Sequence, residues 1–408
     1  MPVLRPADLA ELRTAVRDTT GPLAVAGAGT AAGWAGRLGP VDAVLDTTAL
    51  AGVIVHNPGD MTVAVRAGTP LRELAAELAP HGQHVAVDAA RVARGATVGG
   101  LVATADAGPG ALVRGTMRDL VIGVTVVLAD GTVARSGGHV IKNVAGYDLA
   151  KLLHGSYGAV AVLAEVVLRL HPVPRRSTTV AMPCSLAEAA DHAAQVLASP
   201  LEATALEWCS GADGAGELLV RVEGTRDALP GRVARLRELL GPAADVAADT
   251  SPSERHVRED LAPERAVRGV GDGGVDGSEG PWERHAALVA GSAGRDPAAA
   301  DPGHAVLRLG IRPARLADLV CELPAVTVTA GLGTGVATVT LPPDAVAAAH
   351  DLVHAAGGTS VLRERPPGCD APAWGPPPSA VGMLRAVKQK FDPDGRLGPG
   401  RLSPWLDS

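Results

Sequence analysis

Three clusters of small residues, all within the first 158 residues, constrain the fold of this chain more than any other feature. They read AGAGTAAGWAG at 26–36, GATVGGLVATADAGPG at 95–110 and KNVAGYDLAKLLHGSYG at 142–158. Backbone N–H groups in Gly-rich turns can converge on a phosphate, and glycine adopts left-handed angles that cost other residues about 1–2 kcal/mol. Taken singly, each cluster also fits a structural turn in a chain that holds 50 Gly.

The segments around these clusters have clear strand patterns. An alternating or continuously apolar pattern predicts strands over 60–68 and 159–174, and residues 23–30 predict a short apolar strand that runs into a Gly-rich turn. Residues 120–138 predict a hairpin, because Asp130-Gly131 supplies the positive φ angles of a tight turn. Glu165 lies among apolar neighbours in the last strand, where we expect a structural hydrogen bond to a nearby loop.

Two helices are also predicted in this part of the chain. The first covers 69–82, with Thr69 as its cap, Pro70 at its first position and Gly82 at its end. The second is the short LAKLLH stretch, which Asp148 can cap and Gly155 can end.

After residue 175 strand-like and helix-like stretches alternate, which predicts a separate α+β domain. The expected division has residues 1–175 as one domain, 176–365 as a second, 366–378 as a Pro-rich linker and 379–408 as a segment returning to the first domain. Within the second domain, residues 242–303 have few apolar anchors apart from Trp282, and we expect part of them to be mobile.

Composition and charge limit the partners and the cellular location that we expect for this protein. The net charge is −7 and no Lys/Arg-rich block appears, which argues against nucleic acid as a partner. The N-terminus is charged throughout and no apolar run is long enough to span a bilayer, so we expect a cytoplasmic protein that reaches a membrane only through a partner.

Few side chains suggest chemistry by themselves. The four cysteines share no C-x-x-C spacing, which excludes a local zinc or iron–sulfur cradle and predicts buried free thiols. His350 and His354 have metal-ligand spacing on a predicted helix, but without a third ligand we expect a solvated helix face. The Gly-x-Ser-x-Gly motif of hydrolases is absent, and neither a carboxylate pair nor a catalytic base stands out.

Taken together and in this order, the clusters resemble a known family. They are followed by RGTMRDLVIGVTVVLADGTVARSGG, then by the KNVAGYDLAKLLHGSYG stretch, and at the end by KQKFDPDGRLGPGRL. This order is similar to the FAD-binding domain of the vanillyl-alcohol oxidase / p-cresol methylhydroxylase type, and most of all to the FAD-binding subunits of bacterial glycolate oxidase. The resemblance covers residues 20–175 and 380–402 and implies an α+β fold, with a two-part FAD-binding domain and a second α+β cap-like domain.

The resemblance also implies which residues hold the cofactor. Residues 26–30 would cradle the pyrophosphate through their amides, and the other two clusters would line or close over the dinucleotide and flavin, with the start of the last strand on the adenine side. The implied FAD-binding residues are Ala26, Gly27, Ala28, Gly29, Thr30, Thr97, Gly99, Gly100, Thr104, Gly108, Asn143, Gly146, Tyr147, Gly155, Ser156, Val160 and Val162.

The sequence departs from the family pattern at several points. Ala28-Gly29-Thr30-Ala31 replaces a turn that usually carries a lysine, and Ala105 and Asp106 replace flexible or neutral residues. Gly398 stands where the tail usually has an Asn before Pro-Gly-Arg. No histidine matches a covalent attachment site, so the expected FAD is non-covalent.

The resemblance leaves three readings open. The first is a flavoprotein oxidoreductase subunit that oxidises a 2-hydroxy acid such as glycolate or D-lactate, with hydride passing to flavin N5. The second is an accessory subunit, with or without FAD, that supports a larger catalytic flavoprotein and an iron–sulfur subunit, since the middle region shows few paired Arg and His residues. A sugar-nucleotide reductase is the third reading, and it would lack the loop at 142–158.

Overall fold

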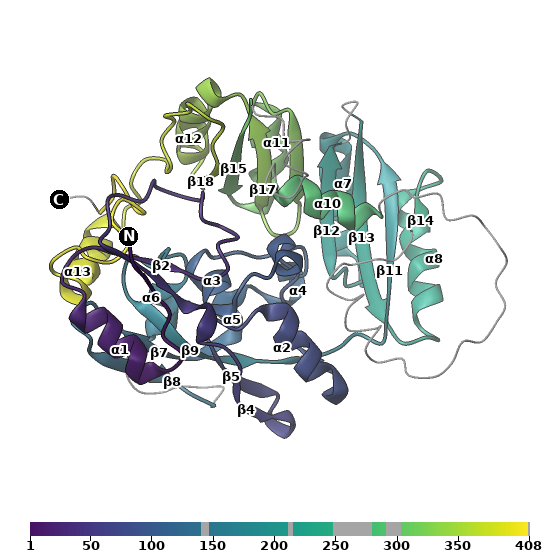
Figure 1. Cartoon of the computed structure of the whole chain (residues 1–408). Helices are drawn as coiled ribbons and strands as arrows, with labels where there is room; N and C mark the ends of the chain where they lie inside the picture. Colours follow the sequence, from purple (N-terminus) through teal and green to yellow (C-terminus); the bar gives the residue numbers. More distant parts are fainter. Residues whose placement is uncertain (140–146, 211–214, 248–279, 291–302, 407–408) are drawn as a thin grey trace.

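The computed structural model of the chain describes residues 1–139, 147–210, 215–247, 280–290 and 303–406 (Figure 1). It has the predicted α+β class. An N-terminal part built on two small sheets faces a separate part built on one large antiparallel sheet, and the C-terminal segment returns to the first part (Figure 1).

The chain begins with a three-stranded parallel sheet in the order β1-β3-β2. Helix α1 (Leu9–Asp18) precedes β2 and is capped by Asp8, whose carboxylate accepts a hydrogen bond from the Glu11 N–H. Leu12 and Val16 of α1 pack into a shared core with the sheet. The strands are β1 (Val3–Leu4), β2 (Leu23–Ala26) and β3 (Ala43–Asp46).

A five-stranded antiparallel sheet in the order β4-β5-β9-β7-β8 forms the other half of this domain. A second apolar core lies between one face of this sheet and the helices α2, α3 and α6. The elements are β4 (Val53–Asn57), β5 (Thr62–Arg66), α2 (Leu71–Leu78), α3 (Val98–Ala103), α4 (Ala111–Arg114), α5 (Met117–Leu120), β7 (Val121–Val127), β8 (Val133–Gly137), α6 (Leu149–Leu153) and β9 (Val162–Arg169), with β6 (Gln83–His84) and β10 (His171–Pro172) paired beside them.

Several local predictions are confirmed. Strands β7 and β8 form the expected hairpin, with Gly131 at a φ of 83°. Asp148 caps α6 by accepting from the Lys151 N–H, and Gly155 adopts a φ of 81° just after this helix.

Two local predictions are wrong in detail. Helix α2 has Pro70 as its N-cap, and Thr69 does not cap it. The Thr69 hydroxyl instead donates to the Arg66 carbonyl and accepts from the Gly52 N–H, so it ties the end of β5 to a loop. Glu165 accepts from the Thr125 hydroxyl on the neighbouring strand β7 at 2.7 Å, and not from a loop.

The second domain is one eight-stranded antiparallel sheet in the order β14-β11-β13-β12-β16-β17-β15-β18. Apolar side chains on one face pack against α7, α8, α11 and α12, which form the largest core. The elements are β11 (Arg176–Pro183), α7 (Leu186–Ala198), β12 (Ala205–Ser210), β13 (Gly216–Gly224), α8 (Leu229–Leu240), β14 (Asp245–Ala247), α10 (Pro281–Ala290), β15 (Ala305–Gly310), α11 (Leu316–Cys321), β16 (Thr327–Gly331), β17 (Val336–Leu341), α12 (Val346–Ala355) and β18 (Thr359–Glu364).

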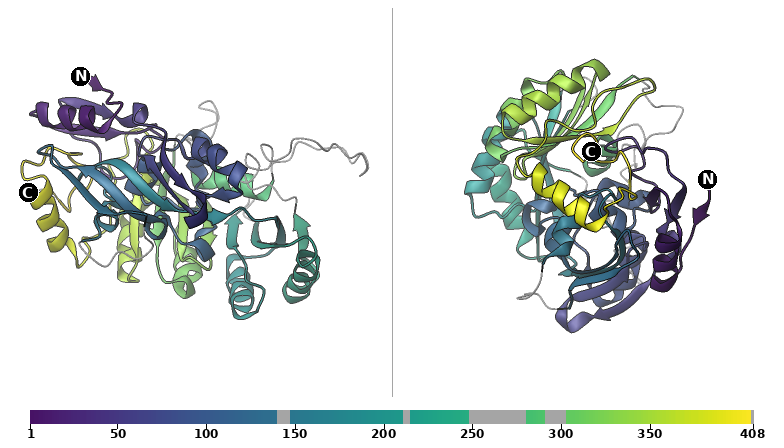
Figure 2. Two further views of the ribbon diagram at one scale, coloured as in Figure 1. Left: turned by 90° about the horizontal axis from the view of Figure 1, so that it is seen from below. Right: turned by 90° about the vertical axis from the view of Figure 1, so that its left-hand side faces the viewer.

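Helix α10 lies on the opposite face of this sheet, near the N-terminal domain (Figures 1 and 2). Trp282 from this helix packs with Ala205, Cys209 and Leu219 in a small separate core. Most of the rest of residues 242–303, expected to be partly mobile, lies outside the described residues.

The C-terminal segment returns to the first domain. Val387 and Phe391 of α13 (Val381–Phe391) pack against the core of the five-stranded sheet. Leu397 pairs with Leu23 of β2 in a parallel bridge. In the part of the chain that the structure describes, no helix is both long and apolar enough to span a bilayer.

His350 contradicts the expected solvated helix face. Its side chain is only 2% exposed, with Nδ1 hydrogen-bonded to the Ser360 hydroxyl at 2.6 Å and Nε2 to the Pro372 carbonyl at 3.1 Å. The reason is that α12 packs its His350 side onto β18 and the Pro-rich segment, while His354 stays exposed. The predicted buried thiols are found for Cys209 and Cys369, but Cys321 is exposed.

Candidate functional site

The first cluster forms an open turn after β2. Gly29 adopts a φ of 72°, and a Cβ built on it would meet no atom within 4 Å. Within the described part of the chain, no acceptor takes a hydrogen bond from the N–H groups of Ala28, Gly29, Thr30 or Ala31. Four successive free N–H groups around a left-handed residue form a concave site for an anion.

The structure brings the second and third clusters against this turn. A Cβ on Gly27 would lie 2.6 Å from the Thr97 hydroxyl, which caps α3 by accepting from the Gly100 N–H at 3.1 Å. In turn, the Gly155 N–H donates to the Val102 carbonyl of α3. Side chains larger than hydrogen at Gly27 would therefore separate the turn from the helix.

Arg91 joins the first cluster to the second. Its guanidinium donates to the hydroxyls of Thr30 and Thr104, at 2.8 and 2.7 Å, and to the carboxylate of Asp106 at 2.9 Å. Ala105, between these partners, adopts a φ of 50°, a conformation that favours glycine. Arg91 was not singled out in the sequence, because it lies in η4 (Ala90–Arg94), outside all three clusters.

Asp106 is the centre of a buried cluster of charges between the two domains. Besides Arg91, its carboxylate meets Arg363 of β18 at 2.7 Å and Arg308 of β15 at 3.5 Å. Asp106 itself is only 1% exposed. Three guanidinium groups and one carboxylate give the cluster a formal excess of positive charge.

This arrangement fixes the protonation of its members. Burial alone raises the pKa of the Asp106 carboxyl, but the charges of Arg363, Arg91 and Arg308 outweigh burial and hold its pKa well below the usual range. Burial lowers the pKa of Arg308 to about 10, and the neighbouring charge of Arg363 acts in the same direction. Both groups are therefore ionised at neutral pH.

The cluster also leaves donors for an anion. Among the described residues, the guanidinium of Arg308 makes no hydrogen bond, and the buried Nε and Nη1 of Arg363, whose guanidinium lies over the Trp34 ring, have no hydrogen-bond partner. Both arginines stand beside the loop that carries Asp106.

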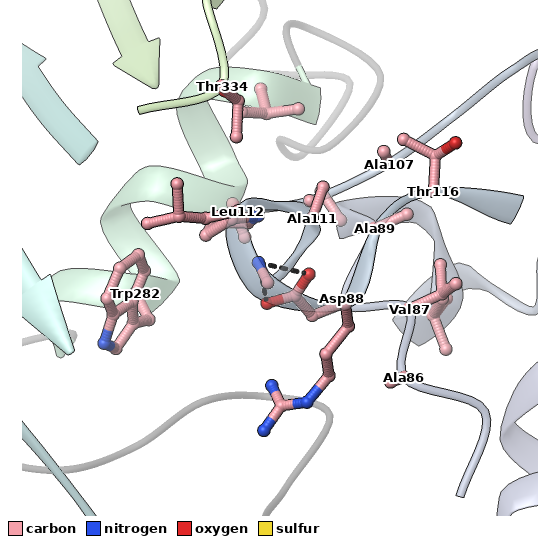
Figure 3. A pocket seen from close by; sticks show the side chains of 18 of the residues that line it. Ala86, Val87, Asp88, Ala89, Ala107, Ala111, Leu112, Thr116, Trp282 and Thr334 are labelled. Atoms are coloured by element: carbon pink, nitrogen blue, oxygen red, sulfur yellow. Dashed lines mark hydrogen bonds between the residues drawn. The ribbon is translucent and has the colours of Figure 1, made fainter. Parts of the chain in front are cut away.

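A cavity of about 410 Å³ lies next to this cluster, between the two domains (Figure 3). One wall is made by loops of the N-terminal domain, including Ala86–Ala90 and Ala107–Ala111, and thus by part of the second cluster. The other wall comes from the large sheet and α10, with Trp282 and Thr334 among the labelled side chains (Figure 3).

Strand periodicity explains the polar character of the second wall. Alternate residues of a strand point to opposite faces. Leu206, Trp208 and Leu307 face the helices in the apolar core. The residues that alternate with such core residues along the same strands therefore face the cavity. The cavity-lining side chains set in this way are Glu207, Arg221, Arg308, Thr329 and Thr338.

Comparison with known proteins identifies the N-terminal part. Residues 2–137 match the family model described as the FAD binding domain. This chain carries an FAD-binding domain. FAD is its cofactor, and when bound it supplies an acceptor for hydride.

The FAD-binding chain is similar to proteins of 2-hydroxy-acid oxidation. It is 36% identical over 234 residues to the glycolate oxidase subunit GlcE of Escherichia coli, in a match covering 57% of this chain and 63% of that subunit. It is 42% identical over 113 residues to a D-lactate dehydrogenase of Archaeoglobus fulgidus, covering 28% of this chain and 26% of the relative. The chain thus spans less than two thirds of the length of either relative.

The fold of the FAD-binding chain recurs in a solved structure. Alkyldihydroxyacetonephosphate synthase superposes with a TM-score of 0.65 over 97% of this chain and 75% of the other, at 15% identity. This similarity covers both domains and supports the predicted pairing of an FAD-binding domain with an α+β cap-like domain.

The residues of the turn fit the diphosphate of FAD. The open N–H groups of Ala28 to Ala31 can donate hydrogen bonds to phosphate oxygens, and Arg91 stands beside Thr30 to balance the charge of the phosphates. A second cation beside the turn is Arg94, which donates to the Thr30 carbonyl at 3.3 Å.

The individual FAD-binding residues remain predictions, and they do not all lie in the same part of the structure. Those of the first cluster and of α3 lie together around the turn, with Gly155 and Ser156 beside α3, whereas Gly108 lies against Asp88 and lines the cavity. Tyr147 stays apart at 89% exposure, beside Ser136 of β8. The side chains of Val160 and Val162 are buried in apolar cores, so only their backbone could face a ligand. Asn143 and Gly146 lie outside the described residues.

The sequence analysis missed the charged residues of the large sheet. Glu207, Arg221, Arg308 and Arg363 each lie in an otherwise apolar strand, on the face opposite the large helices, and all but Arg308 are buried. A charged residue at such a position was the available signal, because burial of an unpaired charge is costly. The middle region, expected to show few paired Arg and His residues, contributes Arg221, Arg308, Arg363 and His285 to ion pairs of the structure.

Proposed function

We propose that this chain is the FAD-dependent oxidoreductase subunit of an enzyme that oxidises a small 2-hydroxy acid, such as glycolate or D-lactate, to the 2-oxo acid. The relatives support the substrate class, because two of them are a glycolate oxidase subunit and a D-lactate dehydrogenase. The cavity would hold the acid, with one wall at the expected flavin loop Ala107–Gly110 and the other on the polar face of the cap sheet.

One observation carries this proposal. Arg308 lines the cavity, is ionised, and makes no hydrogen bond among the described residues. A guanidinium presents paired N–H donors that match a carboxylate. We therefore assign the carboxylate of the substrate to Arg308.

The test is an anaerobic titration of the FAD-loaded chain with glycolate, D-lactate and acids that lack the 2-hydroxyl group. Loss of the oxidised flavin absorbance with the 2-hydroxy acids alone supports the proposal. Arg308→Met should weaken the acid's apparent affinity at least tenfold and leave FAD content unchanged. Arg312, near the exposed end of the same strand and not a lining residue, gives the matched control Arg312→Met.

A second candidate is an accessory FAD-binding subunit without turnover of its own. It is favoured by the similarity to GlcE, which is one subunit of a glycolate oxidase. In that case a larger flavoprotein and an iron–sulfur subunit would complete the enzyme. Flavin that stays oxidised with every acid alone, but is reduced when such partners are added, would favour this role over the first.

A further inference from the structure

His285 and Glu207 form a buried imidazole–carboxylate pair on the cap-side wall of the cavity. The two atoms His285 Nε2 and Glu207 Oε2 are 3.2 Å apart, and each residue is only 6% exposed. Both side chains line the cavity. A buried pair of this kind, open to a cavity of substrate size, is a candidate for proton transfer.

The helix that carries His285 is firmly anchored to the sheet. Trp282, one turn earlier in α10, donates from its indole N–H to the Thr179 hydroxyl at 2.7 Å. Its ring meets the His285 ring edge-on, with centroids 5.7 Å apart. Because both neighbours of the imidazole are fixed, its ring has a defined orientation toward Glu207.

Packing alone does not explain the pair. Ala205, Cys209 and Leu219 on the same face of the sheet form an apolar core with Trp282. Apolar residues in place of a buried ionisable pair often give equal or greater stability. The position of the pair on the cavity wall suggests chemistry instead.

Other ionisable groups on the cavity wall are less suited to accept a proton. Asp88 already accepts from the Gly110 N–H and from Arg221, and Asp119 accepts from the Thr116 N–H. Burial lowers the pKa of His84 to about 4, which makes it a weak base at neutral pH. The remaining charged groups of the wall are the arginines Arg72, Arg114, Arg221 and Arg308, whose guanidinium groups donate hydrogen bonds and accept none.

We propose that His285 accepts the hydroxyl proton of the 2-hydroxy acid and that Glu207 positions its ring. The proposal rests on the proposed function. Oxidation to the 2-oxo acid removes two groups: the Cα hydrogen with its electron pair, for which FAD is the acceptor, and the hydroxyl proton, which goes to His285. The C–O single bond becomes the carbonyl.

The geometry selects the accepting atom. Nε2 faces Glu207, and a proton on Nε2 makes the hydrogen bond to the carboxylate. The lone pair is then on Nδ1, which has no hydrogen-bond partner among the described residues. Glu207 stabilises the positive charge that the ring gains when Nδ1 is protonated.

The first experiment measures flavin reduction in the FAD-loaded full chain after anaerobic mixing with the 2-hydroxy acid. His285→Ala should lower the rate constant about 10²- to 10⁴-fold, as loss of a general base does, with FAD content unchanged. Added imidazole should restore part of the rate, which a merely structural role would not allow. Glu207→Gln should lower the rate less, without rescue by imidazole.

Two histidines serve as comparisons. His354→Ala on the exposed side of α12 should leave the rate unchanged. His84→Ala tests the other histidine that lines the cavity. A loss of rate with rescue by imidazole in a His84→Ala variant, and none in His285→Ala, would overturn the assignment.

A second experiment separates this inference from the proposed function. If the wild-type flavin stays oxidised with every acid, the proposed function fails. Proton uptake on ligand binding can still be measured, and it tests the role of His285 without turnover. Calorimetry with a 2-oxo acid, glyoxylate, in buffers of different ionisation enthalpy counts the protons taken up on binding. The wild type should take up more than His285→Ala. Equal uptake, or no binding at all, overturns the inference.

Discussion

The two walls of the interdomain cavity are built by different means. In the wall from the FAD-binding domain, residues 86–90 and 107–111 carry mostly methyl groups or hydrogen, with charged groups such as Asp88 and Arg114 beside them. In the wall from the cap-like domain, β12, β13 and β15 contribute the charged side chains of Glu207, Arg221 and Arg308, and α10 adds His285. We infer that the first wall recognises a ligand through backbone shape and N–H groups, and the second through side-chain charge.

The difference matters for how each wall responds to mutation. A backbone site depends on φ angles and close approach, so it is sensitive to added Cβ atoms and tolerant of changes in charge. A side-chain site depends on paired charges, and removal of one partner leaves the others buried without compensation.

Asp106→Leu should have the largest effect, because Asp106 belongs to the FAD-binding domain and pairs with arginines of both domains. Its removal leaves three guanidinium groups without their carboxylate. Loss of one partner of a buried ion pair typically costs about 3–5 kcal/mol. Urea unfolding at neutral pH should show a loss of this size.

Two controls sharpen this result. Asp106→Asn retains a hydrogen-bond acceptor and should lose less. Asp18→Asn breaks the exposed pair with Arg17 and should leave the unfolding midpoint unchanged. If added FAD restores the stability of Asp106→Leu, the charged cluster belongs to the cofactor site. The contrast between a backbone wall and a side-chain wall would then be wrong.

Gly29→Val should produce the clearest effect on the backbone side. At a φ of 72° a β-branched residue costs about 1–2 kcal/mol, and its side chain would occupy the open space in front of the free N–H groups. We expect FAD affinity to fall at least tenfold, as measured by flavin retention on gel filtration and by fluorescence titration.

The matched control is Gly357→Val. Gly357 has a φ of 80°, also with no atom within 4 Å of a built Cβ, but it lies at the exposed end of α12. Its stability loss should be similar to that of Gly29→Val while FAD affinity stays unchanged. Equal loss of FAD in both variants would mean that general destabilisation, and not the turn, controls cofactor binding.

The same contrast explains what could be predicted from the sequence. The FAD-binding domain was recognisable because a turn such as AGAGT and a helix start such as TVGG are local: each needs small residues at fixed spacing. Asp106 was noticed only as a departure from the family pattern, since its partners Arg308 and Arg363 are about 200 and 257 residues away.

The cap side was not predictable in this way. Glu207 and His285 are 78 residues apart and meet only because α10 packs on the sheet face opposite the large helices. Thr69 and His350 failed for a related reason, because both take long-range partners that local patterns do not encode. Short sequence motifs therefore predict local backbone geometry. Side-chain pairs on a sheet depend on the topology of the whole domain, which short motifs do not contain.

His350→Ala tests whether loss of a buried polar side chain is also destabilising away from the cavity. The expected loss of stability is smaller than for Asp106→Leu. The variant removes the hydrogen bonds to Ser360 and to the Pro372 carbonyl and leaves a small cavity beneath the Pro-rich segment. The free energy of unfolding at pH 8 should fall by about 2 kcal/mol. His354→Ala, four residues along the same helix and exposed, should change it by only a few tenths of a kcal/mol.

The pH dependence distinguishes the two histidines further. Burial lowers the pKa of His350 below its usual value of about 6.5, so the folded state holds it neutral. Its contribution is fully present above that value and is lost as the pH falls through the lower pKa of the folded state. The stability difference between wild type and His350→Ala should therefore shrink between pH 8 and pH 5, because only the wild type must protonate a buried ring. Urea unfolding at three pH values would measure this, and a difference that stays constant or grows toward acid would show that the ring is already charged in the folded protein.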